Sequence, residues 1–327
     1  GDISGIIAAA RQALEYLPGQ ALSWRTTAIH VLGDAYDFQG DMYESYQSRL
    51  DALAASRATG NSFLIMIASL KLALNHRNQG DLAQVTEICQ EQLQLATESG
   101  LLQADVTGWL LAIWGEVLAE LNDLDGALER ARKGVEIIER GGDLAMLGWS
   151  YLCLTRVLFS RGDLAGAQEV VYKIEATARR SFVPPWIMRL TGVWQARLWL
   201  ARKKVELAAQ WAQERGLDGE PEPEFQREAG YVAQARILMA QGRPGEAAVL
   251  LERLVGGAQA GGRTTAVIEM LALRALSLQA GEQTDQAHTV LEKALTLAGP
   301  HGYTRIFVDE GLPMARLLHQ AAARGIT

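Results

Sequence analysis

The residues best suited to recognition chemistry in this 327-residue chain recur about every 40 residues. The charged set comprises Glu116, Arg156, Arg197 and Arg236. Two helical turns earlier, the corresponding positions are Trp109, Trp149, Leu190 and Ala229. Arginine is a planar, bidentate partner for a carboxylate or phosphate, and tryptophan is a flat apolar platform for a sugar, a ring or a cation. If these positions share one face, they predict a ligand-binding wall made of Trp109, Glu116, Trp149, Arg156, Arg197 and Arg236.

The same residues also have a purely structural interpretation. Arginines on helices commonly lie in water or pair with a neighbouring glutamate, and tryptophans commonly pack between neighbouring repeats. The sequence alone leaves both interpretations open.

Catalytic and metal-binding patterns are weaker. The histidines stand at spacings that zinc sites do not use, and they are His30, His76, His288, His301 and His319. The serines and cysteines have no nucleophile-elbow context, and the carboxylates fall at helix caps and on solvated faces. We therefore expect neither an enzyme nor a metal site.

A repeated turn indicates which elements position the candidate wall. Its copies lie 39–42 residues apart, at Gly40-Asp41, Gly80-Asp81, Asn122-Asp123, Gly162-Asp163, Arg202-Lys203, Gly242-Arg243 and Gly281-Glu282. A second series of breaks falls midway, at Gly60, Gly100, Gly141-Gly142, Pro184-Pro185, Gly219 to Pro223, Gly261-Gly262 and Gly299-Pro300. Two interleaved series with one period predict about seven units, each of two helices and two turns.

The turn residues fit helix boundaries. Glycine ends a helix in the left-handed conformation, and the following aspartate caps the next helix. Asp41 and Glu44 also have capping-box spacing. Pro185 and Pro244 suit the first turn of a helix, where no backbone donor is needed.

Small residues recur where the two helices of a unit would cross. In the first helix they are Gly115, Thr155, Ala196, Ala235 and Ala275, and twelve residues later they are Ala127, Ala167, Ala208, Ala247 and Ala287. The pattern Leu111-x-x-Trp114-Gly115-x-x-Leu118, followed by Ala127, is that of tetratricopeptide (TPR) repeats, with a period longer than their usual 34 residues. We predict an all-α, right-handed superhelix (an α-solenoid) of about seven TPR-like hairpins, forming one domain over residues 1–327. Its first helices should line the concave face, whose curvature the period alone does not determine.

Composition excludes several partners. The formal net charge is −7 without basic clusters, which argues against DNA contact by this chain. Cys89 and Cys153 sit in apolar helical patterns and are interpreted as buried small hydrophobes in a reducing cytosol. No apolar run approaches the length of a membrane span, so we expect a cytoplasmic protein without membrane contact.

The C-terminal half resembles a known family. The resemblance is carried by Trp194–Arg202, by Ala235–Ala247 and above all by Ala294–Leu318, where Phe307-Val308-Asp309-Glu310-Gly311 is the most specific part. These stretches are similar to the superhelical region of the large ATP-dependent, LuxR-type, maltose-regulator-like transcriptional regulators. The remainder of the chain is linked to this family by its period.

The resemblance implies that the superhelix senses a small metabolite and helps to control self-association. In this family it accompanies a nucleotide-binding module, a winged-helix region and a DNA-binding helix-turn-helix. The chain has no G-x-x-x-x-G-K-[ST] loop, and no basic recognition helix follows Leu318. We therefore expect no cofactor here, ATP only in a separate module, and this chain to be a fragment of a larger regulator.

Two functions stay open. The first is an effector-sensing and protein-interaction domain that binds a small inducer or a partner in a concave groove. The alternative is a general TPR scaffold that docks peptides or proteins without a small-molecule ligand. Two unusual loops, Ser181–Trp186 and Asp218–Glu224, are either surface connectors or contact edges for another domain.

Overall fold

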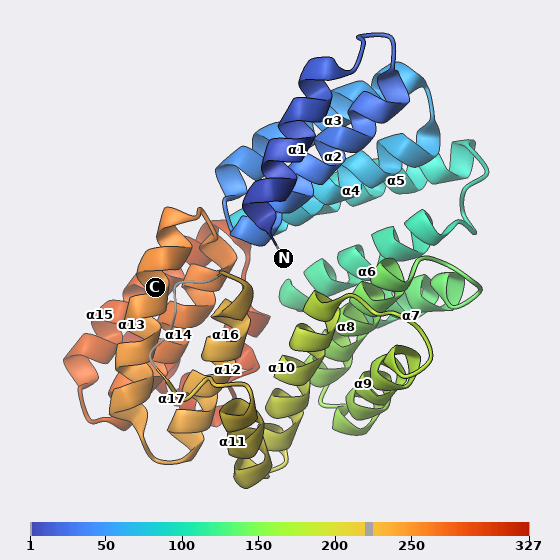
Figure 1. Cartoon of the computed structure of the whole chain (residues 1–327). Coiled ribbons are helices and arrows are strands. Elements are labelled where there is room, and N and C mark those ends of the chain that lie inside the picture. Colours follow the sequence, from blue (N-terminus) through green and yellow to red (C-terminus); the bar gives the residue numbers. More distant parts are fainter. Residues whose placement is uncertain (1, 220–224, 327) are drawn as a thin grey trace.

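The computed structural model describes residues 2–219 and 225–326. Within these residues, seven consecutive helical hairpins form an α-solenoid (Figure 1), which confirms the predicted architecture. The hairpins are α2 (Leu22–Gln39) with α3 (Met42–Thr59), α4 (Ser62–Gln79) with α5 (Leu82–Glu98), α6 (Asp105–Glu120) with α7 (Leu124–Ile138), α8 (Leu144–Ser160) with α9 (Leu164–Ala178), α10 (Pro185–Ala201) with α11 (Val205–Glu214), α12 (Phe225–Ala240) with α13 (Pro244–Ala260), and α14 (Thr264–Ala280) with α15 (Thr284–Ala298).

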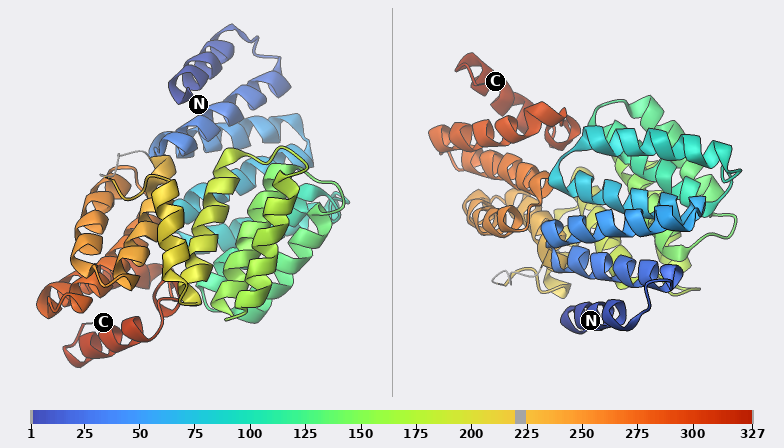
Figure 2. Two further views of the ribbon diagram at one scale, coloured as in Figure 1. Left: turned by 60° about the horizontal axis from the view of Figure 1, so that its bottom comes forward. Right: turned by 90° about the horizontal axis from the view of Figure 1, so that it is seen from above.

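Short elements flank the hairpins at both ends. The helix α1 (Ile3–Tyr16) precedes them, and the 3-10 helix η1 (Gly299–His301), α16 (Arg305–Val308) and α17 (Leu312–Ala323) follow. Figure 2 shows the N-terminal helix and the C-terminal helix at opposite ends of the molecule in both of its views.

The Gly-Asp turns have the conformation that their residue types predict. Gly40 ends α2 at φ +83°, in the left-handed region that glycine enters without strain. The Asp41 carboxylate then accepts a hydrogen bond of 3.1 Å from the backbone N–H of Glu44 and caps α3. Asp81 and Asp163 cap α5 and α9 in the same manner.

Close helix crossings depend on small residues, as in the hairpin of α6 and α7. A Cβ atom on Gly115 would lie 2.8 Å from the carbonyl oxygen of Ala127 and 3.0 Å from the backbone nitrogen of Ala131. Ala127 and Ala131 are fully buried. A larger residue at position 115 would therefore force these two helices apart.

The superhelix closes on itself, a curvature that the repeat period alone does not determine. The backbone N–H of Met42 donates to the carbonyl of Gly261 over 3.2 Å, and the Arg263 guanidinium donates to the carbonyl of Gly40 over 2.8 Å. The hydroxyl of Thr265 donates to the carbonyl of Arg77 at 2.5 Å. The first two hairpins thus contact the last two, because small rotations between successive repeats accumulate to nearly a full turn.

Of the two unusual loops, Ser181–Trp186 belongs partly to this closure. Val183 is buried, and the Trp186 ring lies 5.6 Å from that of Trp149 and 6.4 Å from that of Phe38, measured between ring centroids. In the second loop, Asp218–Glu224, residues 220–224 lie outside the described residues.

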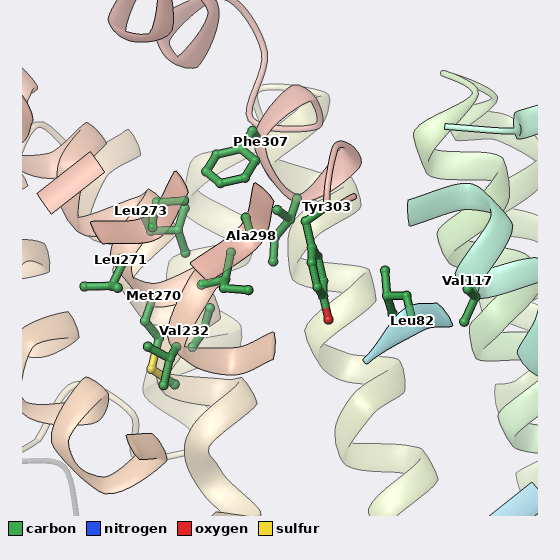
Figure 3. Close-up of a cluster of buried hydrophobic side chains, with 14 of the residues drawn as sticks. Leu82, Val117, Val232, Met270, Leu271, Leu273, Ala298, Tyr303 and Phe307 are labelled. Atoms are coloured by element: carbon green, nitrogen blue, oxygen red, sulfur yellow. The ribbon is translucent and has the colours of Figure 1, made fainter. Parts of the chain in front are cut away.

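The chain segment after α15 turns into the space enclosed by the first helices of the hairpins, which we call the lumen. The helix α16 contacts both α14 and α6. Figure 3 shows Tyr303, which precedes α16, between side chains of α14 and Leu82. The segment therefore fills much of the lumen with its own side chains.

No helix in the described ranges is long and apolar enough to cross a bilayer.

Candidate functional site

Ten ionisable side chains meet in the lumen and form what we call the lumen network. Its cations are Arg77, Arg156, Arg197, Arg236 and Arg305, and its anions are Glu116, Glu120, Glu269, Asp309 and Glu310. The first helices of six hairpins supply seven of them, and the segment 305–310 supplies the other three. The network is balanced in formal charge.

One end of the network lies on α4, α6 and α8. Arg77 contacts Glu116 with an Nη2–Oε1 distance of 2.6 Å, and its guanidinium lies 5.7 Å from the centroid of the Trp149 ring. The Cys153 thiol donates to the other oxygen of Glu116 over 3.7 Å. Arg156 pairs with Glu120, one turn further along α6. The predicted residues Glu116 and Arg156 therefore each have an ionic partner.

Glu310 joins two arginines at the other end of the network. Its Oε1 atom lies 3.1 Å from Nη2 of Arg197 and 2.6 Å from Nη2 of Arg236. Arg236 also contacts Glu269 of α14 over 2.8 Å. Since the Arg197 and Arg236 side chains are only 13% and 9% exposed, they share a carboxylate in a region that water scarcely reaches.

Arg305 and Asp309 fasten the inserted segment to α6 and α8. Arg305 Nε lies 2.8 Å from Asp309 Oδ1, and the Ser160 hydroxyl donates to Asp309 Oδ2 over 2.6 Å. The backbone N–H of Ile306 donates to the Glu120 carboxylate over 2.8 Å. The segment is thus held by polar groups of the wall and by Tyr303, Ile306 and Phe307, which are buried in the hydrophobic core.

Burial and neighbouring charges shift the two carboxylates of α6 in opposite directions. Burial raises the pKa of Glu116, but Arg77 and Arg156 outweigh it and hold that pKa below its ordinary value. For Glu120, burial outweighs the attraction of Arg156, and its pKa lies above the ordinary value. The pKa of Arg197 is lowered by burial and by the positive charge of Arg236.

A cavity of about 90 Å³ lies beside the network. It is lined by charged groups from both ends of the network, together with apolar and hydroxyl side chains: Arg77, Leu82, Glu116, Val117, Glu120, Arg156, Arg197, Arg236, Thr265, Glu269, Tyr303, Arg305, Ile306 and Asp309. The arrangement offers many hydrogen-bond donors and acceptors to a polar guest, and burial strengthens each such contact.

The structure brings four of the six predicted wall residues together, namely Glu116, Arg156, Arg197 and Arg236. Trp109 and Trp149 are not among the residues that line the cavity. Trp109 is 7% exposed and packs in the hydrophobic core, because α6 is buried on nearly all sides along its length. Trp149 packs against Arg77 and Trp186. Their roles in ligand binding stay predictions.

Sequence reasoning missed the other network residues. Glu120 follows Glu116 by one helical turn, and Glu269 occupies in α14 the position that Trp109 and Trp149 hold in their repeats. Glu310 lies in the stretch that carries the family resemblance. The spacings of Glu120 and Glu269 could have identified them as wall residues. No pattern in the sequence indicates that the segment 305–310 inserts into the lumen.

Both cysteines are buried and free, as predicted for small hydrophobes. Among the described residues, no group of three or more His, Cys, Asp or Glu side chains is placed to hold a metal ion.

Stacked hairpins around an enclosed lumen define a TPR-type α-solenoid. The chain belongs to the family described as the MalT-like TPR region, which it matches over residues 1–324. The resemblance found in the sequence is thereby confirmed.

Two curated relatives illustrate the family. The HTH-type transcriptional regulator MalT of Yersinia pestis (strain Pestoides F) is 28% identical over 315 residues, covering 95% of this chain and 34% of that regulator. MalT of Yersinia enterocolitica serotype O:8 / biotype 1B is 27% identical over the same shares. The chain thus spans about a third of the length of these relatives, as the 34% coverage states.

Among solved structures, a tetratricopeptide repeat protein from Parabacteroides merdae ATCC 43184 is similar with a TM-score of 0.47 and 18% sequence identity. The likeness covers 84% of this chain and 93% of that chain.

Proposed function

We propose that this chain is the effector-sensing and protein-interaction domain of a bacterial transcriptional regulator, and that a small effector binds at the lumen network. The observation that carries the proposal is the cavity inside the solenoid, which nine of the ten ionisable groups of the lumen network line. The domain acts by binding and not by catalysis, and ATP binding and DNA contact belong to regions outside this chain.

The energetics of buried ions support a functional role. Removing charges from water is costly, and well-packed apolar residues of similar volume commonly stabilise a protein as well or better. A TPR hairpin needs apolar and small residues for its packing, which the cores around Ala127 and Ala247 already provide. A lumen lined by arginines and carboxylates is better explained by recognition of a polar molecule.

A thermal-shift screen of the chain against small metabolites tests the proposal. A compound that binds only the folded state raises the unfolding midpoint. Calorimetry should then show that its affinity falls when Arg156 and Arg197 are replaced together by alanine. Unchanged affinity in a variant with an unchanged circular dichroism spectrum would place the compound elsewhere and remove this surface from consideration.

A second candidate function is docking of a protein partner, including a second copy of the chain. This function is favoured by three exposed aromatic side chains on α1, α2 and α3. Tyr16, Trp24 and Tyr43 are 73%, 70% and 69% exposed. Sedimentation of the wild-type chain and of a Tyr16→Ser, Trp24→Ser, Tyr43→Ser variant, across a concentration series, distinguishes the two. Identical monomeric behaviour of both proteins would argue against self-association through this surface.

A further inference from the structure

The Glu310 carboxylate contacts Arg197 and Arg236 in the way that the carboxylate of a bound ligand would. A single carboxylate oxygen receives both guanidinium groups, at 3.1 and 2.6 Å. This carboxylate belongs to a segment that enters the lumen after the last hairpin, whereas both arginines belong to the wall. The two arginines therefore form an acceptor site for an anion, and the chain fills it with its own side chain.

The site has more donors than Glu310 uses. Arg197 makes one hydrogen bond to Glu310, and its remaining guanidinium surface packs against the rings of Phe159 and Trp194, at 4.9 and 5.3 Å from their centroids. The Nε atom of Arg156 is buried and has no hydrogen-bond partner within the described part of the chain. An arginine carries five N–H donors, so a ligand with several acceptor oxygens would be bound better than a single carboxylate.

The present cavity is too small for an effector while the segment is docked. Its volume of about 90 Å³ is well below that of typical small-molecule sites, which are about 300 Å³ or larger. Withdrawal of the Glu310 side chain would join the space it occupies to this cavity. Binding of an effector and docking of Glu310 therefore exclude each other.

Two glycines flank the segment, in which Tyr303, Ile306 and Phe307 also contribute to the hydrophobic core. Gly302 and Gly311 both have φ +73°, and Gly311 combines this with ψ −153°, a conformation that is essentially confined to glycine. They delimit the stretch that carries Arg305, Asp309 and Glu310. Backbone rotation at these two positions can release the stretch while α15 and α17 stay intact.

We propose that Glu310 is an internal counter-ion of this site, and that a small acidic effector bearing a carboxylate or a phosphate displaces it from Arg197 and Arg236. Displacement frees the segment 303–310 from the wall. This inference rests on the proposed function. It specifies that the effector is an anion and that the effector competes with Glu310 for the two arginines.

The test compares anion binding by the wild-type chain and by Glu310→Gln, which keeps the side chain's size but removes its charge. The probes are sodium acetate and inorganic phosphate, titrated in a thermal-shift assay at constant ionic strength, with acetamide as the neutral counterpart of acetate. Glu246→Gln is the matched control, because Glu246 pairs with Arg243 on the exposed surface, over 2.5 Å.

We expect half-maximal stabilisation of Glu310→Gln at an anion concentration at least about tenfold lower than for the wild type, since no internal carboxylate must be displaced. Glu246→Gln should behave as the wild type does. A further Arg197→Ala change in the Glu310→Gln background should abolish the effect of the anions. The ranking of acetate and phosphate then assigns the effector to carboxylates or to phosphates.

Equal anion sensitivity of the wild type and Glu310→Gln would overturn the inference, as would an equal response to acetamide. A second measurement does not depend on variants. In the wild type, a saturating anion should speed hydrogen exchange of the Ile306 amide, which donates to Glu120 in the docked state. Exchange that stays unchanged or slows would contradict displacement.

The outcomes separate this inference from the proposed function. A neutral metabolite that stabilises the chain and depends on Arg156 and Arg197 would support effector sensing in the lumen, and it would refute the anionic class. Failure of every compound, anionic or neutral, would count against both.

Discussion

Two clusters of ion pairs in this chain differ in how far apart in sequence their members lie. The first, which we call the N-terminal cluster, consists of Asp34, Asp37, Arg49 and Lys71 on α2, α3 and α4. The second is the lumen network, which links α4 to the segment after α15 and thus spans most of the chain.

The N-terminal cluster is explained by local packing. The Arg49 side chain is 1% exposed and contacts both aspartates, and Lys71 contacts Asp34 over 2.7 Å. Gly33 makes room for the Arg49 side chain, because a Cβ atom at position 33 would lie 2.7 Å from Arg49 Nη1. Every partner belongs to the same or the next hairpin, so this cluster forms whenever two adjacent hairpins stack.

The lumen network depends on closure of the solenoid and on an inserted segment. It can therefore open in part without loss of the hairpins, whereas the N-terminal cluster cannot. The difference indicates which buried charges hold the fold and which are available for a switch, and it leads to four predictions.

The largest effect is expected for Arg49→Ala. It leaves a cavity and removes the main ionic partner of Asp37, so we expect a loss of about 3–5 kcal/mol in the free energy of unfolding. Denaturant unfolding followed by circular dichroism measures it. Arg243→Ala, which removes an exposed ion pair, is the control and should unfold like the wild type. A loss as small as in the control would show that the cluster is not structural.

Gly40→Ala should weaken closure. A Cβ at this left-handed position would also lie 2.7 Å from the Phe225 ring, so we expect a loss of about 2–3 kcal/mol from backbone strain and steric conflict together. Gly60→Ala is a matched control, since its φ is +66° and the space around it is open. Strain alone should make that loss about 1 kcal/mol. Equal losses in the two variants would mean that closure contributes nothing.

Glu310→Ala should lower the free energy of unfolding by about 2 kcal/mol. This is less than for a buried ion pair that cannot open, because the segment can undock and admit water to Arg197 and Arg236. Hydrogen exchange should speed up over residues 303–310 and stay unchanged in α2 and α3. Exchange that increases equally in both regions would contradict the distinction between the two clusters.

The smallest effect concerns the dependence of stability on pH. Glu116, whose folded pKa is lowered, stabilises the fold above its unfolded pKa, and this contribution is lost as pH falls through the folded pKa. Glu120, whose folded pKa is raised, contributes below its unfolded pKa, and this is lost as pH rises through the folded pKa.

We therefore predict opposite effects of pH on the stability contributions of Glu116 and Glu120. From acid towards neutral pH, the stability difference between wild type and Glu116→Gln should grow, and that between wild type and Glu120→Gln should shrink. Unfolding curves at a series of pH values measure both. Slopes of the same sign would show that the two carboxylates do not differ in environment.

Much of the fold could be predicted from the sequence because its signals are local. The Gly-Asp turns and the small residues at helix crossings act within one hairpin, and the structure has them where the period placed them. The same register brought Arg156, Arg197 and Arg236 to one wall, since equivalent positions of stacked repeats face the same way.

The rest depends on distances that no local pattern encodes. Closure results from a small rotation at each repeat, and a few degrees more would leave Gly40 and Gly261 apart. The partner of Arg197 lies 113 residues further along the chain, as its contact with Glu310 shows. Equivalence between repeats also does not reveal that Trp109 packs in the hydrophobic core, because it does not show how deeply each helix is buried.

Closure also limits how this solenoid can change its length. An open array can gain or lose a repeat at either end with little consequence for the others. Here the turn after α2 lies against the turn after α13, and Met42 and Gly261 share a backbone hydrogen bond of 3.2 Å. A duplicated hairpin between them would separate the two turns and open the closure that encloses the lumen. The number of repeats thus determines the shape of the lumen as much as any side chain that lines it.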